Sequence, residues 1–446
     1  MCWFRRLMVC SLIACLLLTS CLSLQPPSPI WPAGVPPRNA AIASAPITLE
    51  VWLAADYINT PPIQALIHDF QAAYPNITIK TKDDILWENM RKEVEFAITQ
   101  GEPPDVAHNH AFAMGAQGLA EQVDDLWHVW NAEQDFMPGA MEDVLWKEHY
   151  YGVPLDINAL FTIYNKRLFR EADLPPLSAT WTFDDLSVIA PRLTKPDGSQ
   201  YALALSASGW TITGLINAAG GDLLTERNGR VTATLDDPHV RSILQLYHTM
   251  SLKDQHATLP PPIERQTDHP VALFQNGKVA MFFSGPWDLA RLRQEAPNMM
   301  DDVGTAPLPR GRSPMAGGSV QGGGSLFIPR GARNREAAFE FMKWAVSDPY
   351  AKRMAVELGR YPVRTELYED PALQSDPLLR PFYDQLKRAR PYKLEAYVQA
   401  NDTWKNVVKS TFDPSMDLNQ VLDQAQVELQ QEIDEVEQAV SGSGKP

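Results

Sequence analysis

Strand-like and helix-like segments alternate, with short connections, from residue 47 onward. Residues 47–53 have the apolar, β-prone composition of a strand, and Thr60-Pro61-Pro62 supplies a cap and an N-terminal proline for a helix. Residues 76–79 and 104–107 are predicted strands, with a helix near 86–99 between them. The first helix carries apolar residues at the spacing of one buried stripe: Ile63, Leu66, Ile67, Phe70 and Tyr74. This alternation favours a parallel sheet covered by helices.

The same pattern returns in the second half of the chain. Residues 159–164 and 278–283 are predicted strands, and Thr182 with Asp185 forms a capping-box sequence that predicts the start of a helix. Residues 418–436 have the periodicity of a long amphipathic helix. A chain of 446 residues suggests about two or three domains. Two α/β lobes therefore fit the pattern better than one continuous sheet.

The N-terminus has the composition of an export signal. Arg5 and Arg6 precede an apolar run over residues 7–18, which is shorter than the roughly 20 residues that a membrane span needs. The run ends in Leu18-Thr19-Ser20-Cys21, which resembles a bacterial lipobox. That resemblance implies a signal peptide over residues 1–20 and a lipidated Cys21. An ordinary cleaved signal with an incidental Cys21 is the alternative.

A proline-rich segment follows the predicted lipid anchor. Residues 21–46 contain many prolines and few bulky apolar residues, so we expect an extended, semi-rigid tether. We therefore expect a globular body outside the cytoplasm, attached to the outer face of the bacterial cytoplasmic membrane through Cys21 alone.

Charge and cysteine positions exclude several classes of function. With 39 basic against 54 acidic side chains, the formal charge is −15, which argues against a nucleic-acid partner and against adsorption on anionic membranes. No cysteine lies beyond Cys21, so cysteine-zinc sites and disulfide frameworks are excluded there.

Motifs of catalysis and cofactor binding are missing from the sequence. There is no nucleophile elbow, no zinc-protease motif and no P-loop, so neither an enzyme nor a cofactor is predicted. His108 and His110 alternate as strand residues on one face do, but without a third histidine or a cysteine nearby they predict no metal site. A glycosidase formed by two distant carboxylates stays open as an alternative.

Two tryptophans are candidates for ligand contact. Trp210 and Trp287 lie on the small-residue turns Ser208-Gly209-Trp210-Thr211 and Ser284-Gly285-Pro286-Trp287, and the second turn directly follows a predicted strand. Ligands in open α/β sheets bind beyond the carboxyl ends of strands. An indole face there can stack on the C–H face of a sugar, while carboxylates and amides bind its hydroxyl groups. The alternative is that both rings cap a core.

Motifs along most of the chain resemble one family. The central signature comprises Tyr151-Gly-Val-Pro154, Tyr164-Asn165-Lys166-Arg167-Leu168-Phe169, Leu174-Pro175-Pro176, Thr180-Trp181 and Leu186. Supporting motifs, in the family's order, are Phe70-x3-Tyr-Pro75-x-Ile77, Gly101-Glu-Pro-Pro-Asp105, Gly220-Gly221, Phe274-x2-Gly277-Lys-x-Ala280-Met281, Gly285-Pro-Trp287, Ala306-Pro-Leu-Pro309, Gly317-Gly318 and Tyr361-Pro362-Val-Arg364. Together they are similar to the family-1 extracellular solute-binding proteins, the maltose-binding-like receptors of ABC importers.

The resemblance implies a two-lobed α/β periplasmic-binding-protein fold, in which hinge-crossing segments join lobes that close on a ligand. The implied layout is residues 47–155 as the first part of lobe 1, 156–315 as lobe 2, 316–360 as the second part of lobe 1, 361–440 as C-terminal helices of lobe 2, and 441–446 as a flexible tail. It also implies a monomer without metal or cofactor, which captures a mono- or oligosaccharide and delivers it to the permease of an ABC importer.

Motif matches also imply the ligand-binding residues. They are Trp52, Asp56 and Tyr57 after the first strand, His108 and Asn109 in a later loop, Asp156 and Asn158 at the first crossing, Trp210 and Trp287 as stacking aromatics, Gly317 and Gly318 at the second crossing, and Arg364 after the third. Two other functions stay open. One is the same fold binding glycerol phosphate, a polyamine or an anion; the other, less favoured, is a secreted glycan hydrolase.

Overall fold

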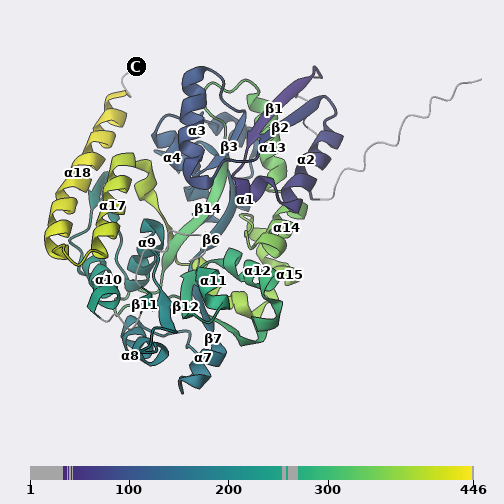
Figure 1. The fold of residues 1–446 in the computed structure, drawn as a ribbon. Helices are drawn as coiled ribbons and strands as arrows, with labels where there is room; N and C mark the ends of the chain where they lie inside the picture. Colours follow the sequence, from purple (N-terminus) through teal and green to yellow (C-terminus); the bar gives the residue numbers. More distant parts are fainter. Residues whose placement is uncertain are drawn as a thin grey trace, which may run out of the picture.

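The computed structural model describes residues 34–37, 39, 42, 44–253, 258–259 and 270–443. The predicted signal peptide, the predicted lipidation site Cys21, most of the predicted tether and residues 444–446 lie outside the described residues. The described part of the chain forms two α/β lobes, which Figure 1 shows above and below a pair of central strands.

The first sheet has the strand order β15-β14-β3-β1-β2, and β6 also pairs with β14. β1 lies parallel to β2 and β3, because helices connect these strands as the sequence predicts. β14 runs antiparallel to β3 and β6. The strands are β1 (Ile47–Trp52), β2 (Ile77–Lys82), β3 (Val106–Asn109), β6 (Gly152–Ala159), β14 (Ser319–Phe327) and β15 (Ala389–Pro391).

The second sheet has the order β11-β8-β12-β7-β13. β8 lies parallel to β11 and β12, whereas β7 runs antiparallel to β12 and β13. The strands are β7 (Phe161–Asn165), β8 (Tyr201–Ala204), β11 (Thr258–Leu259), β12 (Val279–Ser284) and β13 (Val303–Ala306). Both sheets are therefore mixed. The parallel pairing predicted from residues 47–107 is confirmed for β1, β2 and β3, and the antiparallel pairs involve β7 and β14.

Two crossings between the sheets explain the mixed pairing. β6 continues into β7 with only Leu160 between them, so no helix reverses the chain direction. The chain returns from β13 to β14, and β14 pairs with β6 along most of its length (Figure 1). A third link is the bridge between Ile157 and Tyr361. The lobe boundaries stay a prediction. The strand β15 lies in the segment 361–440 that was predicted to belong to lobe 2, but it hydrogen-bonds to β14 of the first sheet.

Helices cover both sheets. The helices of the first half are α1 (Ala55–Ile58), α2 (Pro61–Ala73), α3 (Trp87–Gln100), α4 (Ala111–Ala116), α5 (Asp124–Trp130), α6 (Pro138–Glu142), α7 (Lys166–Glu171), α8 (Phe183–Leu193), α9 (Gly209–Ala219) and α10 (Pro238–His248). Those that follow are α11 (Pro270–Gln275), α12 (Pro286–Glu295), α13 (Arg335–Ala345), α14 (Asp348–Leu358), α15 (Pro371–Gln374), α16 (Arg380–Leu386), α17 (Val398–Thr411) and α18 (Leu418–Ser443). Short hairpins are formed by β4 (Leu145–Trp146) with β5 (His149–Tyr150) and by β9 (Leu224–Arg227) with β10 (Arg230–Ala233).

The predicted start of α8 is confirmed in detail. The Thr182 hydroxyl accepts a hydrogen bond from the backbone N–H of Asp185, and the Asp185 carboxylate accepts one from the backbone N–H of Thr182. This reciprocal pair is a capping box. The apolar stripe of α2 is likewise buried, from Ile63 through Phe70.

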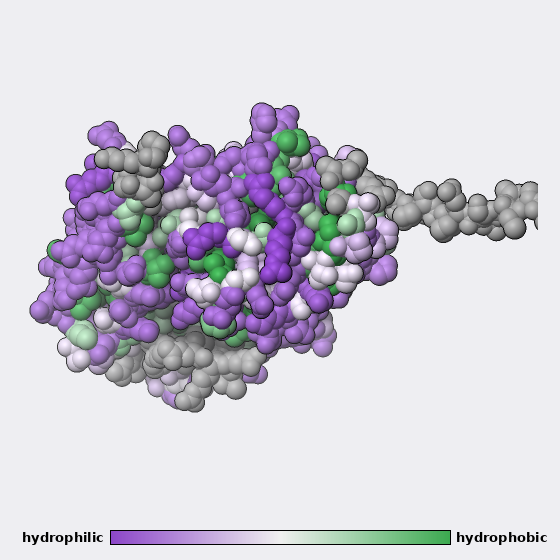
Figure 2. Space-filling model, turned by 90° about the horizontal axis from the view of Figure 1, so that it is seen from above, coloured by the Kyte–Doolittle hydropathy of each residue, from purple (hydrophilic) through white to green (hydrophobic). Residues whose placement is uncertain are grey.

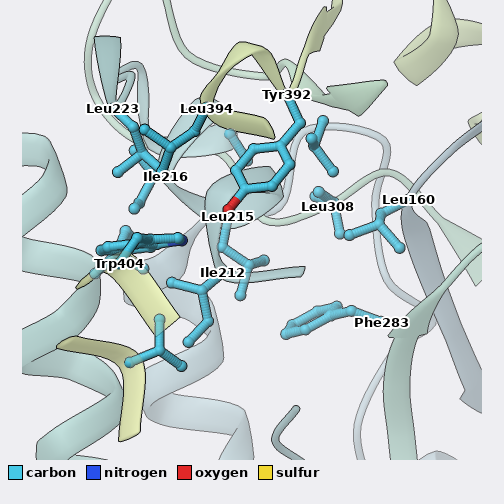
Figure 3. Packing of buried hydrophobic residues seen from close by; sticks show 14 of the residues in the cluster. Leu160, Ile212, Leu215, Ile216, Leu223, Phe283, Leu308, Tyr392, Leu394 and Trp404 are labelled. Atoms are coloured by element: carbon cyan, nitrogen blue, oxygen red, sulfur yellow. The ribbon is translucent and has the colours of Figure 1, made fainter. Parts of the chain in front are cut away.

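Packing against the C-terminal region fixes the position of α9. Ile212, Leu215 and Ile216 of α9 face Trp404 of α17 in the buried cluster of Figure 3. The Trp404 Nε1–H donates to the carbonyl oxygen of Gly209, the first residue of α9, at 3.2 Å. This contact holds the N-terminus of α9 in place, next to the site described below.

The face of the molecule seen from above is predominantly hydrophilic (Figure 2). Figure 2 shows hydrophobic residues only in small, separate patches on the face seen from above. Within the described ranges, no helix combines the length and the apolar composition needed to cross a bilayer.

Candidate solute-binding cleft

A cavity of about 540 Å³ lies between the two lobes. This volume is within the range of small-molecule sites, roughly 300–1,000 Å³. Its walls combine aromatic, charged and amide side chains from segments far apart in the sequence. Those lining residues include Asp56, Tyr57, Trp87, Arg91, Asn109, His110, Gln117, Asn158, Trp210, Trp287, Gly322, Gly323, Arg360, Tyr392, Glu395, Val398, Asn401, Asp402 and Lys405.

Trp210 and Trp287 form one wall of the cavity. Each is the second residue of its helix, α9 or α12, rather than part of an isolated turn. Their ring centroids are 6.1 Å apart at an interplanar angle of 48°, and both rings are half-buried. The Trp210 Nε1–H donates to the carbonyl oxygen of Gln321 at 3.3 Å, which leaves the indole faces for other contacts. The pair presents apolar ring surface to the cavity.

Arg360 links the two lobes at this end of the cavity. Its guanidinium carbon lies 4.8 Å from the ring centroid of Tyr57 and 5.5 Å from that of Trp287, so it makes cation–π contacts on both sides. Its Nη2 also pairs with Asp56 Oδ2 at 2.7 Å. The cation is therefore held by groups from both lobes.

The buried carboxylate of Asp156 hydrogen-bonds to Tyr57. Asp156 Oδ1 accepts hydrogen bonds from the Tyr57 hydroxyl at 3.0 Å and from the Gly324 N–H at 3.1 Å, and Oδ2 accepts from Asn158 Nδ2 at 3.3 Å. Burial raises the pKa of Asp156 to about 6, against the opposing effects of Arg360 and the Tyr57 hydroxyl. Asp156 thus positions Tyr57 and Asn158, both of which line the cavity.

His110 is a second buried cation in the cavity lining. Its Nδ1 lies 2.6 Å from Asp143 Oδ1, and its Nε2 lies 3.4 Å from Glu395 Oε2. Burial alone would lower the pKa of His110, but the Asp143 and Glu395 carboxylates outweigh burial and raise the pKa to about 9. The Ser325 hydroxyl donates to the other oxygen of Asp143. Glu395 precedes α17, so this ion cluster connects α4 of the first lobe to the C-terminal region.

His108 has a different environment. Its ring is fully buried and packs edge-on against Tyr57 and Trp87, at centroid distances of 4.5 Å and 4.9 Å. Burial, with additional repulsion from Arg360 and His110, lowers the pKa of His108 to about 3. A neutral imidazole there fills space between two aromatic side chains. Among the described residues, no group of three or more His, Cys, Asp and Glu side chains is placed to hold a metal ion.

Glycines on β14 form the floor of the cavity. A Cβ atom on Gly322 would lie 2.5 Å from both Trp210 Cζ2 and Asn158 Oδ1. A Cβ atom on Gly324 would lie 2.5 Å from His108 Nε2. The missing side chains let the aromatic wall approach the strand closely.

Helix N-termini also face the cavity. Lining residues lie in the first turns of α3, α9, α12 and α17, and the helices α3, α12 and α17 have no side-chain cap. The first backbone N–H groups of a helix have no partner within the helix, so they are donors for oxygen atoms of a solute.

The structure brings together half of the twelve residues predicted to bind ligand. Asp56, Tyr57, Asn109, Asn158, Trp210 and Trp287 line the cavity, and His108 and Asp156 lie buried directly behind Tyr57. Their contact with a ligand stays a prediction.

The other four lie outside the lining. Trp52 is buried with its Nε1–H on Glu50 Oε1, and Arg364 pairs with Glu366 at 2.7 Å. Gly317 and Gly318 pack beside Arg388 instead.

Several lining residues were not predicted. Trp87 starts a predicted helix, Arg360 precedes the motif that contains Arg364, and Tyr392 and Glu395 lie in a segment with no predicted role. For Trp87, the local sequence contains one indication of a site: an apolar and a charged residue, Trp87-Glu88, stand together at the start of a helix. The other residues reach the cavity only through tertiary packing.

Sequence comparison assigns the family. The model of bacterial extracellular solute-binding proteins matches residues 54–352, which is more than half of the chain. The chain belongs to this family. The solute-binding protein is 27% identical over 339 residues to the maltotriose-binding protein of Pyrococcus abyssi (strain GE5 / Orsay), covering 73% of this chain and 68% of the relative.

Solved structures share the two-lobed fold. The GacH receptor of Streptomyces glaucescens GLA.O, solved unliganded and with acarbose, matches with a TM-score of 0.77 and 21% identity, over 87% of this chain and 99% of that chain. UgpB from Mycobacterium tuberculosis, in complex with glycerophosphocholine, matches with a TM-score of 0.74 and 21% identity, over 88% and 99%. At this identity the likeness establishes the fold of the solute-binding protein.

Proposed function

We propose that this solute-binding protein captures a sugar, either a mono- or an oligosaccharide, in the cleft between its lobes. The observation that carries the proposal is the paired half-buried indoles of Trp210 and Trp287 on one wall of a polar cavity. Apolar ring faces bind the C–H face of a sugar, while the amide and charged groups around them suit its hydroxyls. The maltotriose-binding relative supports the same class of ligand.

Charge pairing in the cleft favours a neutral sugar over a phosphate or a polyamine. Arg360 pairs with Asp56 at 2.7 Å, and Lys405 pairs with Asp402 at 2.9 Å. His110 lies between Asp143 and Glu395. An anionic solute would have to compete with these carboxylates for the cations. UgpB, which has the same fold, was solved in complex with glycerophosphocholine, so a phosphate-containing solute is the alternative to be tested.

The proposed mechanism is closure of two lobes on the bound sugar. Residues 47–155 with 316–360 would move as lobe 1 against residues 156–315 with 361–440. A ligand that contacts both walls stabilises the closed state through its differential affinity for that state. The closed monomer would then dock on the permease of an ABC importer, while a lipid on Cys21 and the tether to residue 46 keep it at the membrane.

We also propose that the sugar leaves unchanged, without hydrolysis. Incubation of the protein with labelled oligosaccharides distinguishes this from a hydrolase. Intact oligosaccharide after long incubation agrees with binding alone, and accumulation of shorter products would establish catalysis instead.

Tryptophan fluorescence titration tests ligand capture. Mono- and oligosaccharides, glycerophosphocholine and spermidine are added in parallel. A solute that binds should change the emission because the indoles of Trp87, Trp210 and Trp287 line the cavity, and we expect that change only with sugars. The double variant Trp210→Ala/Trp287→Ala should lose sugar binding with an unchanged far-UV circular dichroism spectrum, whereas Trp130→Ala, outside the cavity lining, should bind normally. A response to glycerophosphocholine or spermidine but to no sugar would refute the proposal.

A further inference from the structure

The last part of the proline-rich segment packs against lobe 1. Its described residues are 34–37, 39, 42 and 44–46, and we call them the clasp. Val35 and Ile42 are partly buried against the apolar cluster that contains Tyr74, at the end of α2. Gly34 lies beside α14, where a Cβ atom on this glycine would be 3.1 Å from Asp348 Cβ. The clasp therefore contacts two helices of lobe 1 before β1 begins.

Buried polar side chains hold the middle of the clasp. The backbone N–H of Asn39 donates to the Tyr74 hydroxyl at 3.0 Å, and that hydroxyl donates to Glu340 Oε1 of α13 at 2.9 Å. Tyr74 is 1% exposed and Glu340 is 0% exposed. The Glu340 carboxylate pairs with Lys343 and accepts the hydroxyl hydrogen, which leaves the hydroxyl oxygen as the acceptor for Asn39. The clasp thus satisfies a polar group that lies inside the lobe.

The end of the clasp is held as well. Asn76 Nδ2 donates to the carbonyl oxygen of Ala45 at 3.1 Å, and the Ile47 N–H donates to the carbonyl oxygen of Asn76 at 2.8 Å. Contacts near the start, the middle and the end of the clasp thus come from α14, from the end of α2 and from the residue before β2. The prolines of the clasp have a restricted φ in the undocked chain too, so docking costs less conformational entropy.

We propose that the clasp attaches lobe 1, and not lobe 2, to the membrane anchor and so determines which side of the protein faces the bilayer. The proposal rests on the lipidation of Cys21 that is part of the proposed function. The 12 residues between Cys21 and Gly34 can span at most about 45 Å, whereas the 25 residues between Cys21 and Ile47 could span about 90 Å. The docked clasp therefore halves the reach of the anchor. It keeps the side of lobe 1 formed by α2 and α14 towards the membrane, while lobe 2 moves about the hinge.

Trypsin cleavage tests whether the clasp is docked. Arg38 is the only lysine or arginine between Arg6 and Lys80, and the bond after it carries the N–H of Asn39. For the lipidated protein on phosphatidylcholine vesicles, cleavage there separates the lobes from the N-terminus. Wild-type protein should be cut at least about tenfold more slowly than a free peptide of residues 32–46, because the protease needs the bond undocked.

Two variants should release the clasp. Val35→Asp/Ile42→Asp places charges in its apolar contacts and should raise the cleavage rate at least about tenfold, after correction with a peptide that carries the same substitutions. Tyr74→Phe keeps the ring but removes the hydroxyl acceptor, and should raise the rate at least about threefold.

Tyr350→Phe is the matched control for the hydroxyl. The Tyr350 hydroxyl donates to Asp69 Oδ2 at 3.1 Å between α14 and α2, outside the clasp contacts, so this variant should keep the wild-type rate. Cleavage of the wild type at the rate of the peptide, or no acceleration in either clasp variant, would overturn the clasp. Protein that does not bind to the vesicles would overturn the lipid anchor of the proposed function instead, because cleavage at Arg38 can still be measured in solution.

Energy transfer to labelled lipid tests the orientation. No cysteine lies beyond Cys21, so Val356→Cys on α14, 62% exposed, and Val188→Cys on α8, 67% exposed, can each carry a single donor dye. In phosphatidylcholine vesicles with a rhodamine-labelled lipid, the dye on α14 should transfer more energy than the dye on α8 of lobe 2. The Val35→Asp/Ile42→Asp substitutions should reduce that difference. Equal transfer from both sites in the wild type would overturn the proposed orientation.

Discussion

At the residue scale, His110 shows how the cleft holds a charge away from water. The imidazole is 7% exposed and contacts carboxylates from two different segments. The pKa of about 9 lies above the ordinary value of 6.5, so the imidazolium is the form that folding stabilises. The carboxylates of Asp143 and Glu395 depend on that charge in turn, because a buried ion without its partner is strongly destabilising.

Stability should therefore fall at alkaline pH through His110. Since folding raises its pKa from 6.5 to about 9, the contribution is fully present below pH 6.5 and is lost as pH rises through about 9. The contribution at pH 6 is about 3 kcal/mol. In urea unfolding, His110→Gln should be destabilised at pH 6, and the difference from wild type should shrink by about that amount at pH 10. A difference independent of pH would contradict this assignment.

An exposed histidine provides the control for that experiment. His149 is exposed and pairs with Asp124 at 3.1 Å. The free energy of unfolding of the His149→Gln variant should therefore stay within about 0.5 kcal/mol of wild type at both pH values.

Site residues could be predicted where the local sequence carried a signal. Trp210 and Trp287 lie on the small-residue segments Ser208-Gly209-Trp210 and Ser284-Gly285-Pro286-Trp287, and the second directly follows the strand β12. Arg364 was predicted four residues away from Arg360, the arginine that lines the cavity. The position of Arg360 follows from Gly359, whose left-handed φ of +66° turns the chain beside Pro286. That contact between segments distant in sequence has no local pattern.

At the scale of elements, periodicity predicted those with one buried face. The stripe of α2 and the capping box of α8 are encoded by neighbouring residues, and both are confirmed. β14 was not predicted, because Gln321-Gly322-Gly323-Gly324 has no apolar alternation and glycine is depleted in strands. Pairing with β6 on one side and β3 on the other overrides that preference.

The glycines of β14 should be required for ligand binding more than for folding. Gly322→Ala places a Cβ atom at 2.5 Å from Trp210 Cζ2, so the indole must move. We expect sugar affinity to fall about tenfold in calorimetric titration. In the Trp210→Ala background the same substitution should cost less, since only the close contact with Asn158 Oδ1 remains. Equal losses in both backgrounds would show that Gly322 acts independently of Trp210.

At the scale of the whole molecule, periodicity predicted the lobes as α/β units, whereas the crossings between them were expected only from the family resemblance. Alternating elements indicate helix-covered sheets, and the comparisons establish the two-lobed family. The antiparallel pairing of β6 and β14 depends on crossing strands that no periodicity identifies. For the same reason the cavity walls contributed by the C-terminal region were missed.

Ligand binding should make the molecule more compact. In small-angle X-ray scattering, the radius of gyration should decrease when the sugar identified by titration is added at saturation, because the lobes close on it. The Trp210→Ala/Trp287→Ala variant should keep its ligand-free radius at the same sugar concentration. A wild-type radius unchanged at saturation would mean that binding occurs without closure.

The chain crosses from the first sheet to the second at Leu160 and returns to the first sheet between β13 and β14. This path affects the order in which the two sheets can form. Every strand of the second sheet comes from residues 161–306, whereas the first sheet needs β14 between β3 and β6. During synthesis, the second sheet is therefore complete when Ala306 has left the ribosome. The first sheet, by contrast, is complete only after β14 and then β15 (Ala389–Pro391) have been made.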